Sequence, residues 1–438
     1  MRRPNFVFIL ADDLGSADLG CYGAHDAERV SPVLDRMARE GLRFSAGYSN
    51  SPVCSPTRFA LITGRWQYRL RGAAEEPLGR LHGDKLLGPP PQHPTLPSLL
   101  RDAGYDTALF GKWHLGYPPH FGPRKSGYEH FFGVHAGAAD YFSHGIGDKH
   151  DLWDNETEVF EDGYLTDLIS RRAVRYVEQC RADLPFLMSV HYTAPHWPWE
   201  TREDRAESAR LQRERRRVTH VDGGSLATYR TMIRQMDEGI GWILDALQAR
   251  GLAEDTLVVF TSDNGGERFS DNWPFTGGKM DLTEGGIRVP LIARWPRAIA
   301  AGGVSATPAI TMDWTPTMLA AAGVAAHADY PPDGIDLAPL FADPSWNPGR
   351  DLAWRTTHRR QAALRRARMK YLRVDGHEYL FDVVADPRER ANLAMRRPDV
   401  LASLREAWAA WDGTLPAVPR DAQVLLGFTE ADLPRPTH

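Results

Sequence analysis

The sequence predicts an α/β fold with a largely parallel sheet, followed by a smaller α+β unit at the C-terminal end. Short apolar stretches of strand length alternate with stretches in which apolar residues recur at helical spacing. Phe6–Leu10 is a continuous apolar run, which is typical of a strand covered on both faces. Beyond residue 345 the alternation stops, and strand-like stretches precede one last helix.

Length and composition are those of a globular protein. The chain has 438 residues, of which 42% are hydrophobic and 25% charged, so a disordered chain, a coiled coil and a collagen-like fibre are excluded. Lys and Arg total 52 against 57 Asp and Glu, which gives a net charge of −5. This balance leaves no broad basic surface for nucleic acid or an anionic membrane. Oligomeric state stays open.

Domain organisation follows from a change of texture near residue 345. Pro344, Pro348 and Gly349 separate the alternating pattern from the C-terminal stretches. We therefore expect a catalytic unit at residues 1–345 and a C-terminal α+β subdomain at residues 346–438, with a small antiparallel sheet and a terminal helix.

Cysteines and apolar runs bear on the compartment. Three cysteines without a CxxC pair form neither a disulfide framework nor a zinc site. No apolar stretch approaches the roughly 18–20 residues of a membrane span. The apolar run Phe6–Ala11 is too short for a signal-peptide core and no cleavage site follows it. We therefore expect a cytoplasmic protein without a membrane segment.

Helix-end signals and apolar spacing predict the helices. Ser31 and Pro32 are typical of an N-cap and first helical position, and Gly41 of a helix end. Pro56 and Gly64 bracket a second helix in the same way. The later helices show apolar residues three and four apart. The expected helices are Ser31–Gly41, Pro56–Gly64, Thr95–Gly104, Leu165–Val177, Met232–Leu247 and Pro398–Trp411.

Apolar runs bounded by turn residues predict the strands. In the C-terminal region, Gln361–Val374 and Glu378–Val384 are expected to form a hairpin around Asp375-Gly376. The strands expected in the large sheet are Phe6–Leu10, Tyr105–Phe110, Phe186–Tyr192 and Thr256–Ser262.

Polar clusters follow each of these four strands. In open α/β sheets, ligand sites lie at the carboxyl ends of the strands. If the strands are parallel, the clusters meet in one crevice. The clusters are Asp12-Asp13, Gly111-Lys112-Trp113-His114, Thr193-Ala194-Pro195-His196 and Asp263-Asn264-Gly265-Gly266.

The acidic clusters predict a metal site. Asp12, Asp13, Asp263 and Asn264 offer only oxygen ligands, which suit a hard cation, Ca²⁺ or Mg²⁺, and not zinc. Each pair alone is equally typical of a strand-ending turn. Their expected meeting in one crevice favours a shared cation.

Cys54 stands out from the other cysteines. It comes just before the helix expected to begin at Pro56, and a helix N-terminus favours an anion such as phosphate or sulfate. Cys21 and Cys180 are interpreted as small buried hydrophobic residues.

The stretch Cys54-Ser55-Pro56-Thr57-Arg58 matches the C-x-P-x-R signature of the type I sulfatases, which belong to the alkaline phosphatase-like superfamily. The resemblance covers nearly the whole chain and implies a large mixed, mostly parallel sheet flanked by helices, with a smaller C-terminal α+β subdomain. The other blocks that resemble the family are Asn5–Asp13, Gly41–Phe44, Thr63–Arg65, Gly104–Gly116, Pro195–Pro198, Asp263–Gly266, Gly277–Lys279, Glu284–Gly286, Tyr379–Asp382, Asp386-Pro387 and Asn392-Leu393.

The resemblance implies an arylsulfatase-like enzyme that cleaves the sulfate monoester of a sugar, an aryl alcohol or an alkyl alcohol to the alcohol and inorganic sulfate. It also implies that a formylglycine-generating maturation enzyme converts Cys54 to Cα-formylglycine, whose aldehyde hydrates to a geminal diol. One hydroxyl attacks sulfur and displaces the alcohol. The other then loses a proton, and sulfate leaves as the aldehyde re-forms.

A divalent cation is implied by the same resemblance. Its ligands would be Asp12, Asp13, Asp263, Asn264 and residue 54 itself, with Ca²⁺ favoured and Mg²⁺ as the alternative. The cation would lower the pKa of the diol and polarise a sulfate oxygen.

The resemblance assigns the remaining roles position by position. Arg58 would hold and orient residue 54. Lys112 and Lys279 would bind the sulfate oxygens, and Lys279 would also lie near the leaving oxygen. His196 would help bind sulfate and assist departure of the alcohol. His114 would remove the proton of the second hydroxyl in the elimination step.

Two other functions remain open at this stage. A phosphonate monoester or phosphodiester hydrolase of the same superfamily shares the cysteine signature. In those enzymes, however, an Asp-His pair generally stands where this chain has Asp263-Asn264. A non-catalytic sulfate-ester binding protein would keep Cys54 as a thiol.

The substrate's alcohol is not predicted by the sequence. Its pocket is expected in the loops Gly72–Pro91, Tyr117–Asp154 and Trp197–Asp222. Trp197 and Trp199 are expected either to line this pocket or to pack in the core.

Overall fold

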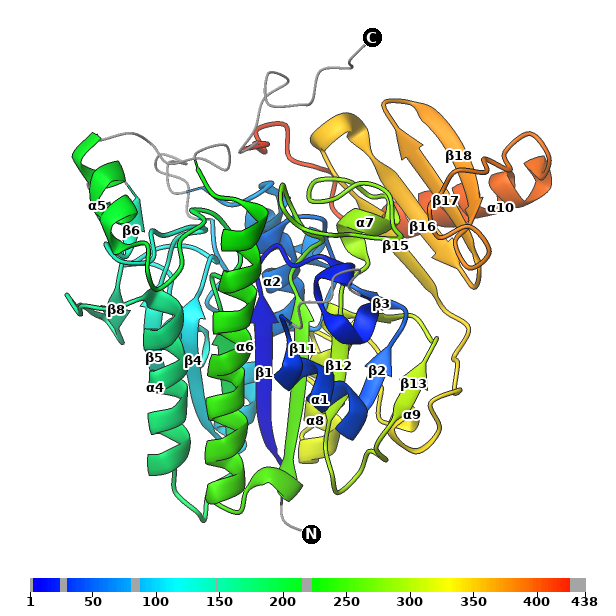
Figure 1. Cartoon of the computed structure of the whole chain (residues 1–438). Coiled ribbons are helices and arrows are strands. Elements are labelled where there is room, and N and C mark those ends of the chain that lie inside the picture. Colours follow the sequence, from blue (N-terminus) through cyan, green and yellow to red (C-terminus); the bar gives the residue numbers. More distant parts are fainter. Residues whose placement is uncertain (1–2, 24–29, 80–86, 147–148, 215–222, 426–438) are drawn as a thin grey trace.

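A computed structural model describes residues 3–23, 30–79, 87–146, 149–214 and 223–425 (Figure 1). Parts of the three loops expected to surround the substrate lie outside these residues. The central feature is a ten-stranded sheet in the order β13-β2-β12-β11-β1-β10-β4-β5-β8-β9. Its strands are β13 (Gly303–Ser305), β2 (Leu42–Phe44), β12 (Leu291–Arg294), β11 (Thr256–Ser262), β1 (Asn5–Ala11), β10 (Phe186–His191), β4 (Asp106–Lys112), β5 (His130–Val134), β8 (Trp153–Asp154) and β9 (Thr157–Glu158).

The middle of the sheet is parallel and its margins are mixed. Strands β11, β1, β10, β4 and β5 pair in parallel, whereas β12, β8 and β9 join as antiparallel strands. Phe8 of β1 lies opposite Ser189 on one side and Val259 on the other. All seven residues of β1 are buried, which explains its unbroken apolar sequence. The predicted large, mostly parallel sheet is confirmed.

Helices cover both faces of this sheet. Side chains of α1, α4 and α6 pack on the face that carries Val7 and Ile9 of β1. Side chains of α2, α3 and α8 pack on the opposite face, against Phe6, Phe8 and Leu10. The helices are α1 (Pro32–Glu40), α2 (Cys54–Thr63), α3 (Leu96–Asp102), α4 (Leu165–Gln179), α5 (Arg205–Glu214), α6 (Leu226–Ala249), α7 (Glu284–Ile287), α8 (Trp314–Ala322), α9 (Pro339–Ala342) and α10 (Pro398–Asp412).

The predicted helices and the four central strands are confirmed, with shifts of boundary. The largest is at α6, which begins at Leu226, six residues before the predicted start. Helix α2 begins at Cys54 itself, two residues before the predicted start. Strand β4 continues through Gly111 and Lys112, because Gly111 keeps the pairing with β10 at a φ of 115°.

The C-terminal region forms a second, separate sheet. Strands β15 (Asp351–Arg355), β16 (Ala362–Arg366), β17 (Met369–Val374) and β18 (His377–Asp382) pair antiparallel in sequence order, and α10 packs against them. The hairpin around Asp375-Gly376 is confirmed. The prediction of one strand over Gln361–Val374 is wrong, because the chain turns at Ala367, whose φ is 50°. No glycine or proline marks that turn.

Two short two-stranded ladders complete the described structure. They are β3 (Gly47–Tyr48) with β14 (Ala309–Ile310), and β6 (Gly145–Ile146) with β7 (Lys149–His150). Within the described ranges, no helix is long and apolar enough to cross a membrane.

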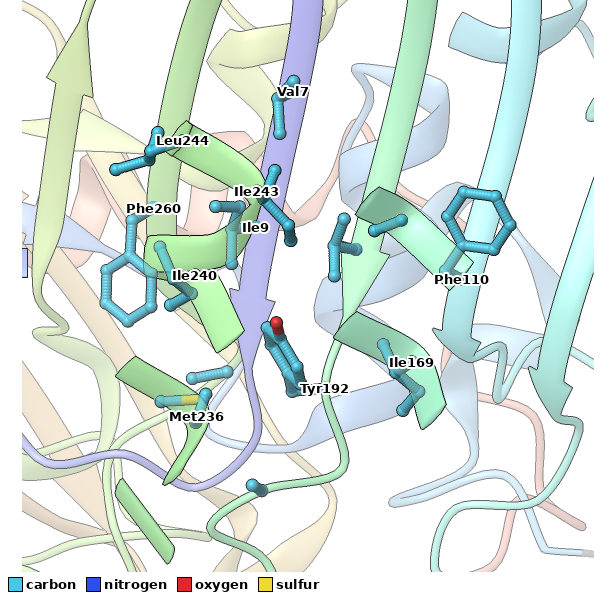
Figure 2. Close-up of a cluster of buried hydrophobic side chains, with 14 of the residues drawn as sticks. Val7, Ile9, Phe110, Ile169, Tyr192, Met236, Ile240, Ile243, Leu244 and Phe260 are labelled. Carbon is cyan, nitrogen blue, oxygen red and sulfur yellow. The ribbon is translucent and has the colours of Figure 1, made fainter. Parts of the chain in front are cut away.

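Helix α6 illustrates how the core stabilises the sheet. Figure 2 shows Met236, Ile240, Ile243 and Leu244 of α6 pointing toward the strands, beside Ile9 of β1. All of them belong to one buried cluster, and Ile240 is fully buried.

Replacing Ile240 with alanine is expected to lower the free energy of unfolding by about 2–5 kcal/mol, since it removes buried methyl groups and leaves a cavity. The matched control is Asp245→Ala on the exposed face of the same helix, with a change within about 0.5 kcal/mol. Urea denaturation measures both. Equal losses for the two variants would contradict the packing described for α6.

Candidate active site

The four polar clusters meet at one edge of the large sheet, as predicted. Strands β11, β1, β10 and β4 are parallel neighbours, so their carboxyl ends lie side by side. Helix α2 brings Cys54 and Arg58 to the same place, and the loop before α7 brings Lys279. The predicted site residues gathered there are Asp12, Asp13, Cys54, Arg58, Lys112, His114, His196, Asp263, Asn264 and Lys279, of which all but Lys279 are at most 5% exposed.

Asp13 is the meeting point of three polar side chains. Asn264 Nδ2 donates to Asp13 Oδ1 at 2.6 Å, and Lys279 Nζ donates to Asp13 Oδ2 at 2.7 Å. His196 Nε2 lies 3.6 Å from the same Oδ2. Burial raises the pKa of Asp13, but Lys279 and His196 outweigh burial and lower the pKa to about 2. The Asp13 carboxylate is therefore ionised at neutral pH.

Arg58 connects the other two carboxylates. Its Nε and Nη2 donate to Asp263 Oδ2 at 3.0 and 2.8 Å, and Nη2 lies 3.5 Å from Asp12 Oδ2. Nη1 donates to the backbone carbonyl of Lys112 at 3.1 Å. The Lys112 ammonium donates to Asp12 Oδ2. Burial and the nearby Asp12 carboxylate raise the pKa of Asp263 to about 6 even though Arg58 opposes them.

Unsatisfied oxygens test whether these residues fit a cation. Ligand atoms of Asp12, Cys54 and Asp263 lie within 4.8 Å of one another, as do those of Asp12, Asp13 and His196. In the described part of the chain, Asp12 Oδ1 and Asn264 Oδ1 are buried without a hydrogen-bond partner. Buried oxygens are rarely left unpaired, because losing water without a replacement costs about 1–3 kcal/mol each. A hard divalent cation fits this set of oxygens.

Cys54 is the first residue of α2 and is almost fully buried. Burial raises the pKa of its thiol to about 11, although Lys112 and Lys279 act in the opposite direction. An encoded Cys54 is therefore a neutral thiol at pH 7 and a weak nucleophile, since the thiolate is the reactive form.

His114 is held as a neutral base. Its backbone has a φ of 56°, and its Nε2 lies 2.8 Å from the carbonyl oxygen of Leu78, which requires the proton on Nε2. Nδ1 then carries a lone pair, and no described residue hydrogen-bonds to it. Gly137 makes room for the ring, because a Cβ there would lie 2.4 Å from His114 Cε1. Burial and Lys112 hold the pKa of His114 well below its usual value.

His196 presents its other ring nitrogen to the site. Nδ1 bonds the carbonyl of Trp197 at 2.6 Å, so Nε2 faces Asp13. Burial and the Lys279 charge lower the pKa of His196 to about 3. The Trp197 ring lies beside His196 at 4.8 Å between centroids. Trp199 instead packs in the core against Phe269.

Sequence reasoning missed two neighbours of the site. Glu267 follows the Asp263–Gly266 cluster, and burial raises its pKa to about 7 although Lys279 lowers it. Its place just after the cluster could have revealed it. Val424 packs against Cys54 and Met280 from the C-terminal tail. No local pattern in the sequence places that tail there.

Comparison with known proteins agrees with this geometry. The family model described as Sulfatase matches residues 4–324. The chain belongs to the sulfatase family. N-acetylgalactosamine-6-sulfatase of Canis lupus familiaris is 36% identical over 370 residues, which cover 78% of this chain and 66% of that protein. Steryl-sulfatase of Mus musculus is 34% identical over 413 residues, covering 78% of this chain and 65% of that protein. The chain thus spans just under two thirds of the length of these relatives.

A solved structure extends the similarity to the C-terminal region. The structure of Ps i-CgsB in complex with k-i-k-neocarrahexaose has a TM-score of 0.84 and 29% sequence identity, and the match covers 95% of this chain and 94% of that chain. The fold that this chain shares with Ps i-CgsB therefore extends beyond the region of the family match.

Arg58 is expected to be essential for the stability of the site. Replacing it with methionine leaves Asp263 and Asp12 buried without their guanidinium partner, and we expect the free energy of unfolding to fall by about 3–5 kcal/mol. Denaturant unfolding in the presence of a chelator measures this. Arg171→Met, on the exposed face of α4, is the control. A loss as small as that of the control would contradict the central role of Arg58.

Proposed function

We propose that this sulfatase-family protein hydrolyses sulfate monoesters of saccharides to the alcohol and inorganic sulfate, with residue 54 as nucleophile after conversion of Cys54 to Cα-formylglycine. The observation that carries the proposal is the contact of Lys112 with Asp12 and of Lys279 and His196 with Asp13, next to the Cys54 sulfur, which lies within 4.8 Å of carboxylate oxygens of Asp12 and Asp263. Cationic and N–H donors in a water-poor site stabilise the charge that develops on a transferring sulfuryl group.

The saccharide class rests on two similarities. One relative acts on N-acetylgalactosamine 6-sulfate by its name, and the structural match to the neocarrahexaose complex covers nearly the whole of both chains. Loops outside the sulfate-binding crevice determine which alcohol part of the ester the protein accepts.

We assign the divalent cation to Asp12, Asp13, Asp263, Asn264 and residue 54. The orphan oxygens of Asp12 and Asn264 support this assignment. Carboxylates and an amide from two segments, together with residue 54 from a third, form an irregular ligand set, which suits the flexible coordination of Ca²⁺ better than the strict octahedron of Mg²⁺. When bound, the cation supplies a Lewis acid that lowers the pKa of the nucleophile and polarises a sulfate oxygen.

The remaining roles belong to side chains of the chain itself. Lys112 and Lys279 bind sulfate oxygens, and Lys279 with His196 supports departure of the alcohol. Neutral His114, with its free Nδ1, takes the proton that must leave residue 54 before sulfate can be released. Arg58, which is bonded to Asp263, orients residue 54 in the site.

A phosphonate or phosphodiester hydrolase is the first alternative. Asn264 disfavours this alternative. Its amide donates to Asp13, whereas those enzymes generally have a histidine at this position. Parallel turnover of a matched sulfate ester and phosphodiester separates the two, and faster phosphodiester turnover by the mature protein overturns our assignment.

We also propose the division into a catalytic unit at residues 1–345 and a C-terminal unit at residues 346–438. The second sheet supports it, because some of its buried side chains form a cluster with α10 alone, whereas the others pack against the catalytic unit. A cytoplasmic location and dependence on a maturation enzyme remain predictions.

The modification of Cys54 is directly measurable. The tryptic peptide Phe44–Arg58 from protein made in its native host contains this one cysteine and is expected to carry the mass of an aldehyde in place of the thiol. Cys54→Ala is expected to lose turnover by about 10³-fold or more, whereas Cys180→Ala, beside the start of β4, keeps it. A well-folded, unmodified parent that binds sulfate esters as tightly as Cys54→Ala supports the binding-protein alternative instead.

Removing the cation is expected to destabilise the protein. Ca²⁺ at about 100 times its Kd should raise the free energy of unfolding of chelator-treated protein by about 2.7 kcal/mol, and Mg²⁺ at the same concentration by less. Asp12→Asn should abolish the effect, while Asp245→Asn on the exposed face of α6 preserves it. Equal stability with and without either cation would refute the metal site.

A further inference from the structure

The loop that carries Lys279 is held from outside the catalytic unit. Residues 276–288 run from the residue before the Gly277–Lys279 block to the residue after α7. Lys279 N donates to the carbonyl of Gly266 at 3.1 Å, and Met280 N donates to the carbonyl of Pro52 at 2.9 Å. The other contacts described below join this loop to the C-terminal unit.

The side-chain amide of Gln361 makes two hydrogen bonds to the backbone of this loop. Its Nε2 donates to the carbonyl of Met280 at 2.8 Å, and its Oε1 accepts from Leu282 N at 2.9 Å. Gln361 lies just before β16 and is only 2% exposed. Both ends of the amide are therefore used, in a place where water does not compete.

Met280, the residue after Lys279, has a φ of 76°. A side chain other than glycine in this left-handed region costs about 1–2 kcal/mol per residue, and such a conformation persists only where its surroundings hold it. Pro52 holds the N–H of Met280 and Gln361 holds its carbonyl. The two bonds together fix the direction in which the chain leaves Lys279.

A buried ion-pair group anchors the far end of the same loop. Lys370 of β17 lies 2.9 Å from both Glu284 and Glu389, and Glu389 accepts from Glu284 N at 2.7 Å. Thr276 donates to the carbonyl of Arg388 at 2.6 Å at the near end. The loop is thus fixed at its two ends by the C-terminal unit, and Gln361 acts next to Lys279.

We propose that Gln361 is a positioning residue of the active site, which fixes Lys279 against Asp13 and the sulfate by holding the peptide groups around Met280. The proposal rests on the function proposed above for Lys279. It makes the C-terminal unit a part of the catalytic apparatus through one side chain, without contact between that side chain and the substrate.

The test compares Gln361→Met with Leu404→Ala. Methionine matches glutamine in length and makes neither hydrogen bond, whereas Leu404→Ala weakens the same C-terminal unit from its core without touching the loop. For Gln361→Met we expect kcat/KM on aryl sulfates to fall about 10- to 100-fold, since small misplacements of a catalytic group have effects of this size. The dependence of kcat on leaving-group pKa should steepen. Leu404→Ala should lower the melting temperature and leave that dependence unchanged.

A double-mutant cycle separates positioning from general destabilisation. In a Lys279→Ala background, Gln361→Met should cost little further activity, because the group it positions is gone. Binding of inorganic sulfate, followed by calorimetry, should weaken about tenfold in Gln361→Met and not in Leu404→Ala, and this readout needs no turnover. Gln361→Glu keeps the acceptor for Leu282 N and is expected to lie between the parent and Gln361→Met, which guards against a methionine variant that does not fold.

The inference is overturned if the effects of Gln361→Met and Lys279→Ala multiply independently, or if Gln361→Met and Leu404→Ala share one kinetic pattern. A parent protein that is modified at residue 54 and turns over no sulfate ester refutes the proposed function instead, before any variant is compared.

Discussion

Burial of several carboxylates at one edge of the sheet is the constraint on which the rest of the site depends. Asp12, Asp13 and Asp263 lie together where water is excluded, and like charges so placed repel strongly. Arg58, Lys112 and Lys279 offset part of that repulsion through direct contacts. The orphan oxygens show that these cations do not satisfy the group completely. The divalent cation proposed above would account for the remainder.

The same burial of carboxylates explains why the cationic side chains here are preorganised to bind an anion. Lys112 and Lys279 are already desolvated and held by carboxylates, so little reorganisation is needed when a sulfate ester enters. His114 and His196 stay neutral because burial and the neighbouring lysines lower their pKa values. A neutral ring keeps a lone pair on one nitrogen and can accept a proton there, which a protonated ring cannot do.

The C-terminal unit supports this site through contacts with the loop that carries Lys279. Gln361 and Lys370 hold the loop of Lys279, and Val424 of the tail packs against Cys54. These contacts join residues that are separated by 80 to several hundred positions. The structural match to Ps i-CgsB likewise covers 95% of this chain.

The four central strands and six of the ten described α-helices could be predicted from the sequence, because apolar runs and helix ends are local patterns. The Cys54–Arg58 signature and its neighbouring blocks indicated the ten candidate site residues that the structure brings together. Their meeting at one edge followed from the rule for parallel strands. The turn at Ala367 escaped prediction because alanine carries no turn signal. Only the tertiary structure decided that Nε2 of His114 is held by the carbonyl of Leu78 and that Met280 is held at a positive φ. It also decided that Gln361 contacts the loop of Lys279 and that Val424 packs beside Cys54. Those features depend on contacts between distant segments, and such contacts leave no periodicity or spacing in the chain that makes them.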